Sequence, residues 1–393
     1  MTTLPRRSLL TLAALGGAAA ATGVAGPSRA AGTDTGPDWS APVRDAIAGL
    51  PDGSAGSLPT ATAAQVRITG PAGRWEGRSG VADLRSGTPV PRRARFRIGS
   101  VTKMFTATVV LQLAAEGRLR LDEPVNRYLP GFLPDAYATA TVRHLLDHRT
   151  GLPSPSWPDG VDWQIEHRFD RYTPEQLVRM ALENEREFEP GRRQHYTNMG
   201  YIVAAVLVRR LTGRSHADEI HRRIVRPLGL RDTVAPGHDP AIHGPHAHGY
   251  QVLDGELVDV TRWNQSSTPA AGDMISSLHD LDTFVRALFR GRLLPPAQQR
   301  DLFAVPDVPD SQTGAPATYS AGLTRLVTAP DGRTIWGKSG ARYGYSAAVA
   351  ATPDAASRLV YSVNSTDAKA EAQAPTIGRI VNAAIGLLLP ATS

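Results

Sequence analysis

Alternating hydrophobic residues at both ends of the chain predict β-strands. Near the N-terminus the alternation runs through Ala61–Thr69 and Arg74–Val81, around a Gly/Pro turn, which predicts a hairpin. Beyond residue 317, the strand-like runs are Tyr319–Thr328, Arg333–Lys338, Tyr343–Thr352 and Arg358–Asn364. The turns between these late runs are short, so we expect an antiparallel sheet.

Between the two ends, hydrophobic residues recur with the period of a helix. Phe96–Ile98 resembles a short strand, Gly99 breaks it, and a helical pattern then continues to Glu116. From about 120 to 310 the helical runs are Thr141–His148, Pro174–Leu182, Asn198–Leu211, His216–Arg226 and Leu278–Arg290. With a last helix over Ala368–Leu389, the pattern predicts an α+β fold. One antiparallel sheet is built from both chain ends, carries flanking helices, and has a mostly helical subdomain inserted at about 120–310.

The first sixty residues have a different composition. In residues 1–30, Arg6-Arg7 precede an apolar stretch, and Ser28-Arg29-Ala30 has the small-x-small pattern of a cleavage site. The paired arginines predict an export signal of the twin-arginine type, with an ordinary secretory signal or a retained anchor as alternatives. Residues 31–59 predict a flexible leader, and 60–390 the folded domain. We therefore expect a secreted, extracytoplasmic protein.

The amino-acid composition excludes several kinds of functional site. The chain has no cysteine, which excludes disulfides, thiol catalysis and cysteine zinc sites. Half of the net charge of +6 lies in residues 1–30, and the other arginines are mixed with acids, which does not indicate a nucleic-acid surface. The apolar run Ile377–Leu389 is too short to span a membrane. Lysine occurs only at positions 103, 338 and 369.

The first candidate for chemistry is Ser100-Val101-Thr102-Lys103. Residues three apart on a helix share a face, so the two side chains can touch. A serine hydroxyl needs a base to become a nucleophile, and a lysine can be that base when burial, a nearby cation and the helix dipole disfavour its charge. The N–H of Ser100 can supply half of an oxyanion hole. Alternatively, Ser100 is a helix cap and Lys103 a solvated side chain.

Two later segments carry residues that could act together with Ser100 and Lys103. Tyr196 and Asn198 open a predicted helix, where the phenol can relay a proton and the carboxamide can bind a substrate amide. Lys338-Ser339-Gly340 ends a predicted strand: Lys338 and Ser339 can bind a carboxylate, and Gly340 lets a substrate backbone lie close.

The N–H of Ala341 would be the second oxyanion donor. Each segment also has a structural alternative, as a packed tyrosine with a capping Asn198, or as a lysine guarding a sheet edge. Two of the three lysines fall in these segments, so the joint occurrence favours catalysis.

Ser-x-x-Lys, Tyr-x-Asn and Lys-Ser-Gly, in this order, resemble the serine β-lactamase and penicillin-binding protein superfamily. The likeness is greatest to secreted D-alanyl-D-alanine carboxypeptidases and class C β-lactamases. It implies the β-lactamase/transpeptidase-like fold, a monomer without a cofactor or metal, and peptidoglycan stem peptides or β-lactams as partners. Ser100 would be acylated, Lys103 and Tyr196 would share its proton, and Asn198 would hold the substrate amide. Lys338 and Ser339 would face the terminal carboxylate.

The resemblance also implies two further positions. Trp263 is similar to an aromatic residue that lines the cleft of the carboxypeptidases, with a plain core tryptophan as the alternative. Arg325 is a candidate carboxylate anchor. The chain departs from the carboxypeptidases at Lys338, where they tend to have histidine, and from many relatives at Ala341, where a hydroxyl residue is common.

Three other functions are compatible with parts of the sequence. A β-lactamase, an esterase or a D-amino-acid amidase would share the acyl-enzyme step. A non-catalytic wall-binding module would not need Ser100, Lys103 and Tyr196. A metal site is conceivable at the four histidines of one Gly/Pro-rich loop, which are His238, His243, His246 and His248. They lack a His-Glu-x-x-His pattern, so we expect structural roles for them.

Overall fold

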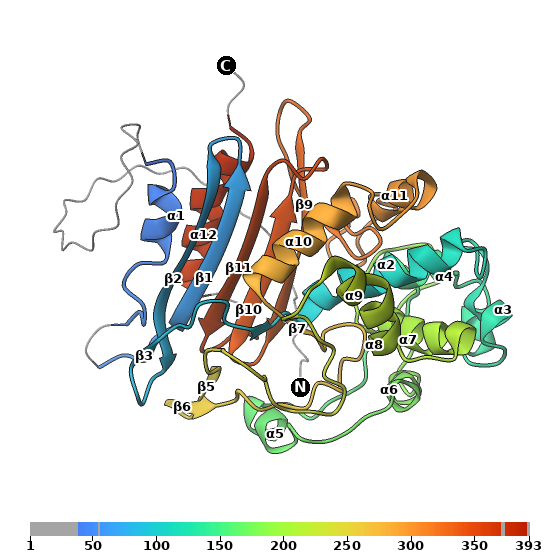
Figure 1. Cartoon of the computed structure of the whole chain (residues 1–393). Coiled ribbons are helices and arrows are strands. Elements are labelled where there is room, and N and C mark those ends of the chain that lie inside the picture. Colours follow the sequence, from blue (N-terminus) through green and yellow to red (C-terminus); the bar gives the residue numbers. More distant parts are fainter. Residues whose placement is uncertain (1–37, 54–55, 371–373, 391–393) are drawn as a thin grey trace.

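A seven-stranded antiparallel sheet joins the two ends of the chain (Figure 1). The computed structural model describes residues 38–53, 56–370 and 374–390, so the predicted export signal lies outside the described residues. In sheet order the strands are β3 (Thr88–Pro89), β2 (Gly73–Asp83), β1 (Ala61–Gly70), β11 (Arg358–Ser365), β10 (Tyr345–Ala351), β9 (Thr334–Arg342) and β8 (Thr324–Thr328). Strand β1 pairs with β11, with Val66 opposite Tyr361, which confirms the predicted sheet.

Helices cover both faces of the sheet. Because successive side chains of a strand point to opposite faces, Val66 and Ile68 of β1 pack toward α12 (Pro375–Leu388), while Arg67 points toward α10 (Leu278–Phe289). Helix α1 (Ala41–Ala46) packs on α12 through buried residues, although the sequence placed this segment in the flexible leader. β1 is therefore buried on both faces, and the core has two layers.

The segment between β3 and β8 is mostly helical, as predicted. Its helices are α2 (Thr102–Ala115), α3 (Val125–Tyr128), α4 (Val142–Leu146), α5 (Val161–Glu166), α6 (Pro174–Ala181), α7 (Met199–Thr212), α8 (His216–Ile220), α9 (Arg226–Leu228), α10 and α11 (Pro296–Leu302). Helix α2 runs through the centre, apolar on nearly every side, and Phe105 stacks on Phe284 of α10 with ring centroids 3.7 Å apart. None of the helices in the described part of the chain has the length and hydropathy needed to cross a membrane.

Some elements differ from the sequence expectation. β9 continues to Arg342, so Lys338, Ser339 and Gly340 lie inside the strand rather than at its end, because the pairing with β10 extends to the turn at Gly344. The helical segment also contains the hairpin β5 (Tyr250–Leu253) and β6 (Glu256–Asp259), and the short pair β4 (Phe96–Arg97) and β7 (Ile275–Ser276). Such short strands leave little periodicity to detect.

A buried carboxylate fastens α10 to the sheet. Asp282 accepts hydrogen bonds from Arg67 of β1 at 3.2 Å and from Arg358 of β11 at 2.7 Å, and all three side chains are at most 10% exposed. One carboxylate therefore compensates guanidinium groups on two strands that come from opposite ends of the chain.

We predict that Asp282→Ala lowers the free energy of unfolding by about 3 kcal/mol, because it leaves buried guanidinium charge uncompensated. Asp122→Ala is the control, since Asp122 pairs with Arg143 but is 78% exposed, and its loss should cost about 1 kcal/mol or less. Urea denaturation of both variants measures the difference. Equal losses would contradict the role given to Asp282.

Candidate active site

Ser100 lies at a sharp turn between β4 and α2. It belongs to a short 3-10 turn, Gly99–Val101, and not to the first turn of the α-helix as the sequence predicted. Gly99 has φ +48°, and a Cβ there would lie 2.6 Å from the backbone nitrogen of Ala341, so only glycine fits. The turn therefore brings the half-buried Ser100 close against β9.

Lys103 is fully buried beneath Ser100. Its Nζ donates to Ser100 Oγ at 3.2 Å, to Asn198 Oδ1 at 2.7 Å and to the carbonyl oxygen of Ala271 at 2.9 Å. Each of these acceptors is neutral. The amine is thus placed at the nucleophile without a carboxylate to hold a proton on it.

The surroundings of Lys103 favour its uncharged form. Burial lowers the pKa of Lys103 well below its usual value, and the charges of Lys338 and Lys369 lower it further, while Asp273 opposes this. Burial also lowers the pKa of Lys338, to about 7. An uncharged amine can accept the proton of a serine hydroxyl, so the site meets the electrostatic requirement for a lysine base.

Tyr196 stands between the two lysines. Its ring centroid is 4.9 Å from Lys103 Nζ and 4.6 Å from Lys338 Nζ. The hydroxyl is buried and has no hydrogen-bond partner among the described residues. Burial raises the pKa of Tyr196 well above its usual value, and Ser100 offsets a small part of this rise. The phenol is therefore held protonated and available to donate.

Asn198 orients the lysine. It precedes α7 but does not cap it, because its Oδ1 accepts from Lys103 Nζ. From the sequence, we expected the carboxamide of Asn198 to bind the substrate amide. Its oxygen is engaged by Lys103, and its nitrogen makes no hydrogen bond within the described residues, which leaves the nitrogen to face a substrate.

Strand β9 forms the wall opposite Ser100. A Cβ on Gly340 would lie 2.1 Å from the carbonyl oxygen of Ile98 and 2.5 Å from the Ser100 nitrogen, so the missing side chain makes room for the nucleophile turn. From the sequence, we expected the substrate backbone to occupy the space beside Gly340. The Ser100 and Ala341 nitrogens therefore border one small region, as the two donors of an oxyanion hole must.

One edge of β9 is open beside this region. β8 pairs with β9 only as far as Gly337, opposite Thr324, so Lys338–Arg342 has no neighbouring strand on that side among the described residues. Lys338 Nζ donates to the carbonyl oxygen of Ser339 at 3.1 Å. An extended substrate can add to this edge as a further strand.

Two residues predicted from the sequence, Trp263 and Arg325, are not part of the cluster around Ser100 and Lys103. Trp263 is only 5% exposed and stacks on Tyr343 at 4.5 Å, packed with Ile165 and Val260, which favours the core alternative. Arg325 is exposed on β8 and lines a groove of about 610 Å³ that begins at Lys338 and Ser339 and continues between the sheet and α12.

The sequence reasoning missed His148. It has φ +62°, its ring centroid lies 4.5 Å from that of Tyr196, and its Nδ1 accepts from the Thr197 backbone at 3.4 Å. Burial lowers the pKa of His148 well below its usual value, so the neutral ring supports Tyr196 without adding a cation. A single histidine in a helical run carries no local indication of this role.

The loop histidines do not gather at one point, although the rings of His246 and His248 stack at 5.8 Å. His243 contacts Asp239 at 2.6 Å, His248 contacts Asp259 at 2.7 Å, and His246 contacts the carbonyl oxygen of Gly244. No group of three or more histidine or acidic side chains in the described ranges could hold a metal ion.

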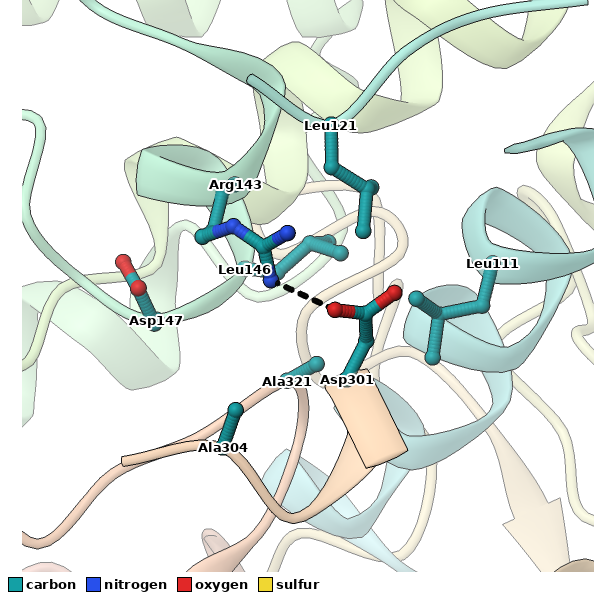
Figure 2. Close-up of a pocket in the computed structure, with 8 residues that line it drawn as sticks. All are labelled: Leu111, Leu121, Arg143, Leu146, Asp147, Asp301, Ala304 and Ala321. Carbon is teal, nitrogen blue, oxygen red and sulfur yellow. Dashed lines mark hydrogen bonds and ion pairs between the residues drawn. The ribbon is translucent and has the colours of Figure 1, made fainter. Parts of the chain in front are cut away.

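A small cavity lies beside α4, and its size excludes it as a substrate site. It measures about 10 Å³, room for one water molecule at most (Figure 2). Arg143 reaches Asp301 across it at 2.9 Å, while the carboxylate of Asp147 turns away and pairs with Arg149 at 2.7 Å. It cannot admit a substrate.

We predict that Asn198→Asp shifts the acid limb of kcat/KM upward by about one pH unit or more. A carboxylate in place of Asn198 Oδ1, 2.7 Å from Lys103 Nζ, would favour the ammonium form and raise the pKa of the base. The measurement is a pH profile with p-nitrophenyl acetate. Asn198→Ala is the control, because it removes the same contact without a charge. If both variants lose rate with no movement of the limb, Lys103 is not the group that titrates.

The chain is similar to known proteins in sequence and in fold. The "Beta-lactamase" family model matches residues 60–382. The chain is 28% identical to penicillin-binding protein 4* of Bacillus subtilis over 299 residues, covering 72% of this chain and 64% of that protein. It is 34% identical to esterase EstB of Burkholderia gladioli over 171 residues, covering 39% of this chain and 41% of that protein. The chain thus spans less than two thirds of these curated relatives.

Solved structures match over greater lengths. A D-stereospecific amidohydrolase from a Streptomyces species has a TM-score of 0.74 and 31% identity, covering 89% of this chain and 99% of that one. The D-amino acid amidase of Ochrobactrum anthropi SV3, in complex with D-phenylalanine, has a TM-score of 0.72 and 27% identity, covering 88% and 98%. The match of the family model over most of the chain and the shared fold lead to one conclusion: this protein belongs to the β-lactamase family of serine hydrolases.

Proposed function

We propose that this protein is a serine D-alanyl-D-alanine carboxypeptidase, which cleaves the last amide bond of a peptide after a D-residue through an acyl-enzyme. The observation that carries the proposal is the position of Ser100 Oγ, 3.2 Å from the buried Lys103 amine, in a turn that lies against β9, the strand of Lys338 and Ser339. The likeness to penicillin-binding protein 4* and to a D-stereospecific amidohydrolase supports it.

Acylation follows from the contacts at Ser100. The uncharged Lys103 amine takes the hydroxyl proton as Oγ attacks the carbonyl carbon. The developing oxyanion accepts hydrogen bonds from the N–H groups of Ser100 and Ala341. The leaving amine takes a proton from Tyr196, which recovers it from Lys103, and an ester on Ser100 remains.

Deacylation uses the same groups. A water molecule gives a proton to the uncharged Lys103 and attacks the ester carbon, and the oxyanion region again holds the negative oxygen. Collapse breaks the bond to Oγ, which regains the proton. The products are the shortened peptide acid and a free Ser100, so atoms and protons balance.

Lys338 and Ser339 distinguish a carboxypeptidase from an amidase. A free carboxylate on the leaving residue would meet the Lys338 ammonium and the Ser339 hydroxyl beside the open edge of β9. Together with residues 1–30, this leads us to propose a peptidoglycan stem peptide as substrate and an extracytoplasmic place of action.

A D-amino-acid amidase is the second candidate. The amidase of Ochrobactrum anthropi shares the fold over 88% of this chain. The leaving group of an amidase, ammonia, carries no carboxylate, so Lys338 could still lower the pKa of Lys103 but would have no carboxylate of a leaving residue to bind. β-Lactam or ester hydrolysis would also share the acylation step.

A substrate panel separates these activities. We expect diacetyl-L-Lys-D-Ala-D-Ala to be hydrolysed, with slow labelling of Ser100 by benzylpenicillin seen by mass spectrometry. Ser100→Ala should abolish both. Preference for D-phenylalaninamide would favour the amidase, and rapid penicillin turnover the β-lactamase. Labelling that persists in Ser100→Ala would remove Ser100 from the mechanism.

The pH profile tests Lys338. Because the pKa of Lys338 is lowered to about 7 by burial, the ammonium is lost as the pH rises above 7. We predict that kcat/KM for the D-Ala-D-Ala peptide falls above about pH 7, while that for p-nitrophenyl acetate, which has no carboxylate to bind, does not. Lys338→Met should remove this difference between the two profiles. Identical basic limbs for both substrates in the wild type would count against the carboxylate contact.

A further inference from the structure

The segment Ala270–Met274 carries one of the acceptors that hold Lys103. The carbonyl oxygen of Ala271 accepts a hydrogen bond from Lys103 Nζ at 2.9 Å. The carbonyl oxygen of Ala270 accepts from Thr106 Oγ1, also on α2, at 2.7 Å, and Ala270 has φ +60°. An alanine keeps this left-handed conformation only where its surroundings hold it. The position of the Lys103 amine therefore depends on what fixes this segment.

The other end of the segment is fixed by Met274 and Asp273. The N–H of Met274 donates to Thr102 Oγ1 at 3.2 Å, and its carbonyl oxygen accepts from the N–H of Ile98 at 3.0 Å. Asp273 Oδ2 contacts His216 Nε2 at 2.7 Å, and both side chains are largely buried. Since His216 is the first residue of α8, the pair links the segment to that helix.

Helix α8 is a firm support for this link. The side chain of Ser215, directly before His216, caps the helix. Glu219, which is fully buried, pairs with Arg223, and Arg223 reaches Glu116 at the end of α2 at 3.0 Å. α8 is thus attached to α2, and His216 has a fixed place beside the segment.

The charge of Asp273 is compensated on one oxygen only. His216 engages Oδ2, while Oδ1 is buried and has no hydrogen-bond partner within the described residues. Burial lowers the pKa of Lys103 and of Arg342, and the charge of Asp273 opposes this in both. Neither of these residues forms an ion pair with Asp273 in the described part of the chain. The carboxylate therefore acts on the base through space, without touching it.

We propose that His216 and Asp273 are positioning residues for Lys103. His216 fixes the Asp273 carboxylate, and with it the segment Ala270–Met274, so that the Ala271 carbonyl oxygen holds the amine in place. The contact with His216 also keeps the carboxylate from turning toward the amine, where it would stabilise the ammonium. This inference rests on Lys103 as the base of the proposed function, and it adds two residues that touch neither the substrate nor the reacting atoms.

The test is the acid limb of the pH profile of kcat/KM with p-nitrophenyl acetate. Asp273→Asn keeps the shape of the side chain and removes its charge, so the limb should move down by about half a pH unit or more. His216→Ala leaves the carboxylate without its partner, so the limb should move up. The double variant should move the limb down as Asp273→Asn does, because the effect of His216 passes through that carboxylate.

Two controls accompany these variants. His216→Gln keeps an N–H donor near the position of Nε2, so the limb should stay as in the wild type. His243→Ala breaks a second His–Asp contact, that with Asp239 at 2.6 Å in an exposed loop, and should not move the limb. Asp273→Asn is nearly isosteric, so it remains informative if His216→Ala fails to fold.

Movement of the limb separates this role from a purely structural one. If Asp273→Asn and His216→Ala lower kcat/KM but leave the limb in place, the pair only stabilises the fold and the inference is wrong. Movement of both variants in the same direction contradicts it as well. So does a double variant in which the limb still moves up, because His216 would then act without Asp273.

Failure of the proposed function would look different. If the D-Ala-D-Ala peptide is not cleaved, the ester still reports acylation of Ser100, so the pair is tested whatever the natural substrate is. If Lys103 is not the base, Asn198→Asp also leaves the limb in place, and this inference fails with that assignment. A limb that moves in Asn198→Asp but not in Asp273→Asn contradicts the role of the pair alone.

Discussion

The site depends on one physical condition, the burial of Lys103 without a carboxylate. An exposed lysine is protonated at neutral pH and cannot take a proton from serine. Here desolvation and neighbouring cations lower the pKa of Lys103, and neutral acceptors on Ser100, Asn198 and Ala271 fix its position. A carboxylate at any of these three contacts would stabilise the ammonium and remove the base.

The fold supplies that environment by bringing distant segments together. α2 is enclosed by apolar residues on nearly all sides, so the amine of its second residue, Lys103, is buried. Strand β9 comes from the other end of the chain and reaches the nucleophile turn because β1 pairs with β11. Asp282 secures this closure by binding Arg67 and Arg358 from the two chain ends.

The same arrangement makes the cleft cationic. The charges of the other two lysines of the chain, Lys338 and Lys369, both act on Lys103. These charges lower the pKa of the base, and on the proposed function the charge of Lys338 also attracts the carboxylate of the leaving residue.

The sequence by itself determined the elements and the chemistry of the site. Alternation and helical periodicity predicted the sheet and the central helices, and the short motifs at Ser100, Tyr196 and Lys338 indicated the reacting groups. These features are local, because they depend on residue type and spacing within a few turns or strands. The tertiary structure decided the rest: it placed Trp263 in the core, used Gly340 for the approach of the nucleophile turn, packed His148 on Tyr196, and brought Lys369 within electrostatic range of Lys103. Burial and electrostatic range depend on contacts between residues far apart in the chain, which no local pattern specifies.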